Sequence, residues 1–163
     1  MKVAVLYHSV TGTTKKMAEV IVDGINSVAG VEGKAFSILE MDEEYIKESR
    51  CVILGTPVYY ANMTGEMKIW FEKRGRKLPL AGKIAGAFAT ANYAHGGGEL
   101  AIQTLLDHMM VLGMLAYSGG GACGRPVIHL GPLAVTEHAD QYTELFQTYG
   151  QRMAMKTLEL FPA

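Results

Sequence analysis

The stretch from residue 5 to residue 21, VLYHSVTGTTKKMAEVI, constrains the fold more than any other part of the chain. Its apolar run ends at Tyr7, small hydroxyl residues and Gly12 follow, and apolar residues then return at helical spacing. This pattern predicts a strand, a tight loop and a helix. The first backbone amides of a helix have no partner within the helix and lie at its positive dipole end, so the loop predicts an anion site.

A single phosphate group is the anion that fits this loop best. The loop offers short hydroxyls and one glycine, and it contains no lysine. The chain has no G-x-x-x-x-G-K-[ST] motif, because Gly82 and Lys83 are followed by Ile84, and nothing else resembles the cradle of a nucleoside triphosphate. The predicted phosphate contacts are Ser9, Val10, Thr11, Gly12, Thr13 and Thr14.

The charge and composition of the chain limit the kinds of molecule that it is expected to bind. The 163 residues include 15 basic and 16 acidic side chains, for a formal net charge of -1, and 49% of them are hydrophobic. These values predict a single globular domain over residues 1–163, with no basic surface for nucleic acid or an anionic membrane. The N-terminus has too short an apolar run for a secretory signal, and no segment reaches the roughly 20 apolar residues of a membrane span. We therefore expect a cytoplasmic protein without membrane insertion.

The cysteines and histidines predict neither a disulfide framework nor a metal site. Cys51 lies in an apolar strand pattern and Cys123 in a glycine-rich loop, without C-x-x-C spacing, so we expect two free thiols. The five histidines are scattered and show no ligand spacing. We expect no bound metal.

Apolar segments with strand character alternate with helical patterns along the chain. Strands are predicted at residues 2–7, 35–39, 50–55, 83–90 and 114–118. Helices are predicted at residues 14–28, 41–48, 63–77, 100–112 and 137–160, with Trp70 in a buried stripe. Because strands that alternate with helices pair in parallel through right-handed crossovers, the pattern predicts an α/β, doubly wound, five-stranded parallel sheet.

The first strand, loop and helix resemble the phosphate-binding segment of flavodoxins. The positions that match the flavodoxin signature are Val5, Leu6, Tyr7, Ser9, Gly12, Thr14, Ala18 and Ile21. The resemblance implies FMN as cofactor and the flavodoxin-like strand order 2-1-3-4-5, with helices on both faces. In that order the loops after strands 1, 3 and 4 converge on one cleft, and here they are residues 9–14, 56–63 and 90–98.

The second and third of these loops carry the residue types that a flat isoalloxazine ring needs. Such a ring requires aromatic or aliphatic faces and hydrogen-bond partners for its polar edge. The predicted contacts are Pro57, Val58, Tyr59, Tyr60, Asn62 and Met63 in the second loop, and Thr90, Ala91, Asn92, Tyr93, Gly96 and Gly97 in the third. His95 is the candidate catalytic residue, since it could donate a proton or a hydrogen bond to the flavin or to a bound quinone.

Two glycine patterns imitate the dinucleotide fingerprint of Rossmann folds. Residues 96–101 satisfy G-x-G-x-x-A, but no acidic residue stands at the end of the next predicted strand. Residues 119–124 satisfy G-x-G-x-x-G, but they run into Arg125 and Pro126 instead of opening a helix. Neither pattern predicts a Rossmann site.

Most of the chain resembles the flavodoxin-like NAD(P)H:quinone oxidoreductases of the tryptophan-repressor-binding type. GTPVYYANMTGEMKIWFE looks like the second flavin loop and helix of that family, LAGKIAGAFAT like its fourth strand and GGGEL like its third loop. Val58 and Tyr59 stand where that family usually has arginine and phenylalanine. The resemblance implies NAD(P)H as electron donor, a small-molecule quinone as acceptor, and a homodimer or homotetramer.

Two other functions compatible with the sequence are an electron carrier and an FMN-free structural or regulatory relative. A flavodoxin-like carrier would serve protein redox partners, and such carriers are strongly acidic because their charge steers them to basic partners. The near-neutral charge of this chain favours small-molecule substrates. The reaction that the resemblance to the quinone oxidoreductases implies is hydride transfer to FMN followed by two-electron reduction of a quinone.

Overall fold

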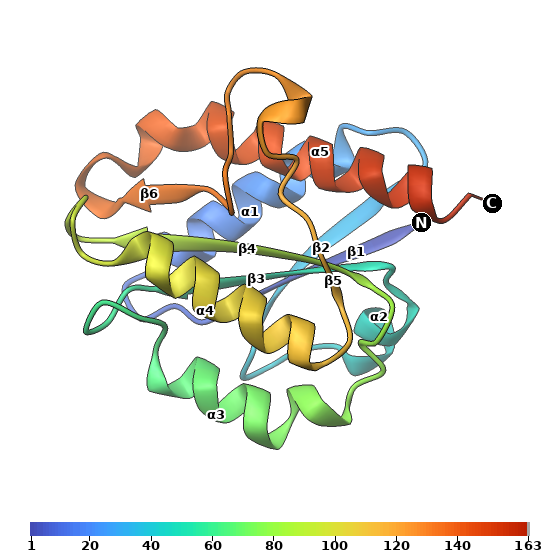
Figure 1. Cartoon of the computed structure of the whole chain (residues 1–163), viewed down its shortest axis with the longest axis horizontal. Helices are drawn as coiled ribbons and strands as arrows, with labels where there is room; N and C mark the ends of the chain where they lie inside the picture. The colour runs from blue at the N-terminus through green and yellow to red at the C-terminus, as the bar shows by residue number, and fades with distance from the viewer. Residues whose placement is uncertain (163) are drawn as a thin grey trace.

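The computed structural model describes residues 1–162 and contains a parallel sheet between two layers of helices (Figure 1). The strands are β1 (Lys2–Tyr7), β2 (Glu32–Ser37), β3 (Cys51–Pro57), β4 (Ile84–Ala91), β5 (Leu115–Ala116) and β6 (Leu133–Val135). Neighbouring strands pair in the order β2-β1-β3-β4-β5, and all pairs are parallel. The predicted doubly wound sheet and its strand order are confirmed.

The helices divide between the two faces of the sheet. Helices α1 (Thr13–Asn26) and α5 (Thr143–Leu160) cover one face, and α2 (Glu43–Glu48), α3 (Gly65–Lys73) and α4 (Gly98–Val111) cover the other (Figure 1). Successive side chains of a strand point to opposite faces, so Val3 and Val5 pack toward α1 and α5, whereas Ala4 and Leu6 pack toward the second layer. Trp70 is buried there, as predicted. Within residues 1–162 no helix is long and apolar enough to cross a membrane.

The edge of the sheet beside β4 differs from the prediction. Only Leu115 and Ala116 of the predicted strand 114–118 pair with β4, at its beginning. The chain then leaves the sheet through a glycine-rich segment with a short 3-10 helix, η2 (Gly121–Cys123), and returns as β6, which pairs with the end of β4. Glycines with positive φ at positions 119, 120 and 124 turn the chain out of the extended conformation. The sixth strand was not predicted.

Three predicted element boundaries differ from the structure. Strand β2 begins at Glu32, earlier than the predicted residue 35, because Glu32 and Lys34 remain exposed on this edge strand and so do not continue the apolar pattern. The predicted helix 137–160 is divided: η3 (Thr136–Tyr142) is a 3-10 helix with a non-helical residue at His138, and α5 begins at Thr143. A third 3-10 helix, η1 (Gly75–Lys77), follows α3. Helix α3 ends at Lys73 instead of the predicted residue 77, and the other helix and strand ends move by a residue or two.

Two glycines allow α1 and α5 to pack with their backbones in contact. A Cβ atom on Gly24 would lie 2.1 Å from the carbonyl oxygen of Gln147, and one on Gly150 would lie 2.2 Å from that of Ile21. Any larger residue at either position would separate the helices. This contact holds α1, and therefore the loop before it, firmly on the sheet.

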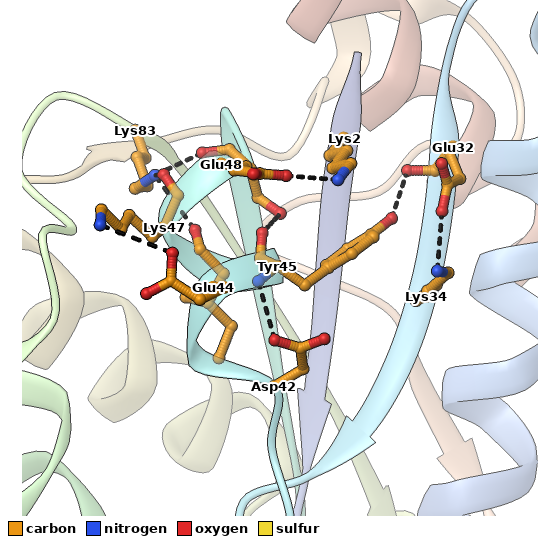
Figure 2. A network of polar contacts seen from close by, with 11 residues as sticks. Lys2, Glu32, Lys34, Asp42, Glu44, Tyr45, Lys47, Glu48 and Lys83 are labelled. Carbon is orange, nitrogen blue, oxygen red and sulfur yellow. Dashed lines mark hydrogen bonds and ion pairs between the residues drawn. The ribbon is translucent and has the colours of Figure 1, made fainter.

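Polar contacts hold α2 against the beginning of the strands (Figure 2). The Asp42 carboxylate caps the helix by accepting a hydrogen bond of 3.0 Å from the backbone N–H of Tyr45. The Tyr45 hydroxyl donates to the carbonyl oxygen of Glu32, 2.8 Å away. At the other end of α2, the buried Lys83 ammonium donates to three backbone carbonyl oxygens. These contacts fix the crossover between β2 and β3.

The two cysteines occupy different environments. Cys51 is fully buried in β3, and burial raises the pKa of its thiol to about 12. Cys123 is exposed in η2, and both thiols are free. In the part of the chain that the structure describes, no three His, Cys, Asp or Glu side chains come together as a metal site would require.

Candidate functional site

The loop between β1 and α1 is arranged to receive an anion. Gly12 has a φ of 99°, and the backbone amides of Gly12 and Lys15 donate to Ser9 Oγ at 3.2 and 3.3 Å. The Ser9 hydroxyl hydrogen is then available for another acceptor. No acidic side chain lies in the first turn of α1. The remaining amides and the dipole of α1 therefore face this loop without a competing carboxylate.

The second loop forms a tight turn after β3. Tyr59 and Asn62 exchange backbone hydrogen bonds of 2.9 and 3.0 Å. Between them Tyr60 and Ala61 have φ values of 49° and 61°, as in a type I′ turn, which usually carries Asn or Gly at these positions. Non-glycine residues in this conformation are strained and persist only where the surrounding structure holds them. The turn presents the Tyr60 side chain fully to solvent.

The third loop touches the second. Tyr93 and His95 are exposed, and their rings stack with centroids 5.7 Å apart and an interplanar angle of 11°. The backbone N–H of Gly96 donates to the carbonyl oxygen of Tyr93 at 3.0 Å. Gly97, the N-cap residue before α4, has a φ of 95°, and a Cβ atom there would lie 2.6 Å from the Cα atom of Ala61. Direct backbone contact thus sets the separation of the two loops.

The three loops meet around a cleft of about 230 Å³ at the carboxyl ends of the strands. Its lining residues are Thr11, Thr13, Pro57, Val58, Tyr59, Tyr60, Thr90, Asn92 and Thr136. All of these except Thr136 are predicted contacts. Thr136 comes directly after β6, a strand that was not predicted, so its position at the cleft was not predicted either.

Thr14 is a predicted phosphate contact that lies beneath the cleft. Its side chain is buried, and its hydroxyl oxygen is 2.8 Å from that of Thr90, also buried. A hydroxyl has one donor and two acceptor positions, so this contact still leaves Thr14 capacity for a phosphate oxygen. The Thr14–Thr90 hydrogen bond ties the start of α1 to the end of β4.

The other predicted contacts surround the cleft without lining it. Val10 is exposed beside the first loop, and Ala91 is buried at the end of β4. Asn62 accepts a hydrogen bond of 2.8 Å from the backbone N–H of Met63 through Oδ1, and Met63 packs against the apolar core. The predicted residues of the third loop beyond Asn92 follow in sequence and do not line the cleft, and they are Tyr93, His95, Gly96 and Gly97.

A larger hollow of about 500 Å³ lies between α3 and α4. Several of its polar side chains already pair with each other: Lys68 contacts Glu72 at 3.2 Å and His108 Nε2 at 3.0 Å. The hollow has no glycine-rich loop and no helix N-terminus. We place the candidate site at the smaller cleft, where helix amides, hydroxyls and aromatic side chains converge.

The residue types at this cleft fit FMN. The amides and hydroxyls of residues 9–14 suit a phosphate group, and the absence of a Cβ atom at Gly12 leaves the loop open. Pro57, Tyr59 and Asn92 offer apolar, aromatic and amide surfaces to a flat ring with a polar edge. Fold and site together define a flavodoxin-like protein.

Comparison with known proteins identifies the family. Residues 39–124 match the family model described as NADPH-dependent FMN reductase. A flavodoxin of Clostridium saccharobutylicum is 40% identical over 99% of this chain and 100% of its own. An NAD(P)H dehydrogenase (quinone) of Geotalea daltonii is 33% identical over 74% of each chain. The chain belongs to the NADPH-dependent FMN reductase family of flavodoxin-like proteins.

Solved structures agree with this fold. A WrbA-like flavodoxin from Agrobacterium tumefaciens superposes with a TM-score of 0.78 at 21% identity, over 97% of this chain and 98% of its own. An archaeal flavodoxin superposes with a TM-score of 0.78 at 24% identity, over 96% and 99% of the two chains. These comparisons confirm the family resemblance that the sequence indicated. They also confirm the prediction that the cofactor is FMN.

Proposed function

We propose that this chain is an FMN-dependent NAD(P)H:quinone oxidoreductase. The observation that carries the proposal is the set of exposed aromatic side chains on the two loops that meet at the cleft, namely Tyr60, Tyr93 and His95. Exposed, flat side chains suit small planar substrates that bind in turn above a flavin. The formal net charge of -1 and relatives named NAD(P)H dehydrogenase (quinone) support the same function.

The residues of this chain would have two roles: some would bind FMN, and one would deliver a proton to the quinone. Ser9, Thr11 and the amides at the start of α1 would hold the phosphate. Bound FMN supplies the redox chemistry, accepting a hydride from NAD(P)H and passing two electrons to the quinone. Reduction of a quinone to a quinol also consumes two protons, and the exposed His95 of the third loop is the side chain we assign to hydrogen bonding or protonating a quinone oxygen.

A second candidate function is that of an electron carrier for protein redox partners. The full-length match to a protein named flavodoxin, at 40% identity, favours it. The charge of this chain argues against it, because carriers that are steered to basic partners have strongly acidic surfaces. The two candidates share the same FMN site and differ in whether small molecules turn over there.

An anaerobic reduction experiment separates the two candidates. The FMN-loaded protein is mixed with NADPH or with NADH, and the flavin absorbance near 450 nm, a property of the chromophore, is followed. The expected result is rapid bleaching that a quinone reverses. Flavin that stays oxidised although FMN is firmly bound would contradict the proposal and favour the carrier. A protein that binds no FMN would contradict both.

Removal of single hydroxyls tests the phosphate loop. Ser9→Ala and Thr14→Ala are each expected to weaken FMN binding by about 1 to 3 kcal/mol. Each variant removes a hydroxyl that either donates to the charged phosphate or keeps the loop in its conformation. Titration calorimetry measures the affinity. Thr104→Ala is the control, since the Thr104 hydroxyl bonds only to its own helix, at the carbonyl oxygen of Leu100. Unchanged affinity in both loop variants would refute this placement of the phosphate.

A further inference from the structure

His8 is a buried side chain that the proposed function does not use. It lies between β1 and the phosphate loop, and it is 7% exposed. Its backbone N–H donates to the carbonyl oxygen of Gly55 at 3.1 Å, which continues the pairing of β1 with β3. Its ring nitrogen Nδ1 lies 3.0 Å from Oγ1 of Thr64, 56 residues further along the chain.

Thr64 closes the base of the second loop. Its Oγ1 accepts a hydrogen bond of 3.3 Å from the backbone N–H of Met67 and so caps α3. Its own backbone N–H donates to Thr56 Oγ1 at 3.2 Å. Thr56 stands where the chain enters the loop and Thr64 where it leaves, so this contact joins the two ends. His8 joins that base to the phosphate loop.

The direction of the His8–Thr64 hydrogen bond follows from the available protons. The Thr64 hydroxyl already accepts from Met67, and it has a single hydrogen to donate. If that hydrogen goes to His8 Nδ1, the Thr64 hydroxyl has both a donor and an acceptor, and the His8 ring carries its proton on Nε2. If His8 donated instead, the buried Thr64 hydrogen would need another acceptor. The first arrangement is therefore the consistent one.

We propose that His8 is a positioning residue of the FMN site, acting through Thr64 on the loop from Pro57 to Met63. The inference rests on the proposed function of that cleft. The loop contains the strained residues Tyr60 and Ala61, and a strained turn keeps its shape only when its surroundings restrain it. The contact with Gly97 restrains the tip of the turn, and the His8–Thr64 hydrogen bond restrains its base.

Two substitutions of His8 test the hydrogen bond by its loss and its rescue. His8→Phe keeps a ring of similar size but removes the acceptor and leaves the Thr64 hydroxyl unsatisfied. FMN binding should weaken about tenfold, a difference measured by fluorescence titration. His8→Asn places an amide oxygen near the position of Nδ1 and should bind FMN within about twofold of the wild type. Equal affinities in the wild type and His8→Phe, or equal losses in both variants, would overturn the inference.

A measurement without FMN separates this inference from the proposed function. Hydrogen exchange of the backbone amides of residues 57–63 in the cofactor-free protein should be faster in His8→Phe than in the wild type, with His8→Asn restored. Unchanged exchange would overturn the positioning role even if FMN binds. Failure of the wild type to bind FMN would instead refute the proposed function.

The Thr64 side of the hydrogen bond provides the test if His8→Phe does not fold. Thr64→Ser keeps the hydroxyl, and exchange should stay as in the wild type. Thr64→Ala removes it, and exchange should quicken in residues 57–63 as well as in the first turn of α3. Faster exchange confined to α3 would mean that Thr64 serves only as a helix cap, and it would overturn the role of His8.

Discussion

Gly97→Val is expected to weaken FMN binding about 30- to 100-fold, which corresponds to roughly 2 to 3 kcal/mol. Gly97 has a φ of 95°, and a Cβ atom would lie 2.6 Å from Cα and 2.7 Å from the carbonyl oxygen of Ala61. These are backbone atoms, which cannot rotate away as a side chain can. The third and second loops must then separate, and Tyr59 and Tyr60 move with the turn that contains Ala61.

The control for this prediction is Gly30→Val. Gly30 has a φ of 84°, but nothing lies within 4 Å of the position of its Cβ atom, and it connects α1 to β2 away from the cleft. This variant should lose about 1 to 3 kcal/mol of the free energy of unfolding from backbone strain and keep its FMN affinity. Urea unfolding and FMN titration measure the two quantities. Equal FMN affinity in both variants would refute the role of the Gly97–Ala61 contact.

The sequence predicted the parallel sheet well because the signals for it are local. Apolar runs such as residues 50–55 indicate strands covered on both faces, and helical spacing indicates what lies between them. The edge beside β4 could not be predicted in this way. Only Leu115 and Ala116 remain of one expected strand, and β6 is too short to stand out from the loop before it.

The loops of the site were predictable because strand order alone makes them converge. The contacts that tie them together were not. Thr14 and Thr90 are 76 residues apart, and nothing in their neighbourhoods in sequence marks two hydroxyls that will meet. The turn at Tyr60 and Ala61 was equally hard to predict. Turns of this kind are recognised by Asn-Gly or Asp-Gly at the two central positions, and this turn has Tyr and Ala there. Such features depend on tertiary contacts instead of local preference.

Lys83→Met is expected to lower the free energy of unfolding by about 3 kcal/mol. The Lys83 side chain is 6% exposed, and its ammonium donates to the carbonyl oxygens of Ile46 at 3.1 Å, Lys47 at 2.8 Å and Ser49 (Figure 2). The last carbonyls of a helix have no partner within it, so a cation at this end of α2 satisfies them and complements the helix dipole. Burial, followed by the charge of Arg50, lowers the pKa of Lys83. Methionine has a similar length, so the variant removes mainly the charge and its hydrogen bonds.

Lys47→Met is the matched control, and urea unfolding measures both variants. The exposed Lys47 ammonium contacts Glu44 at 3.5 Å, a surface pair one helical turn apart, and its loss should cost less than about 0.5 kcal/mol. Lys83 precedes β4, at the opposite end of that strand from Thr90 and the cleft. Folded Lys83→Met should therefore bind FMN like the wild type. Similar losses of stability in the two lysine variants would show that the carbonyls of α2 need no buried cation.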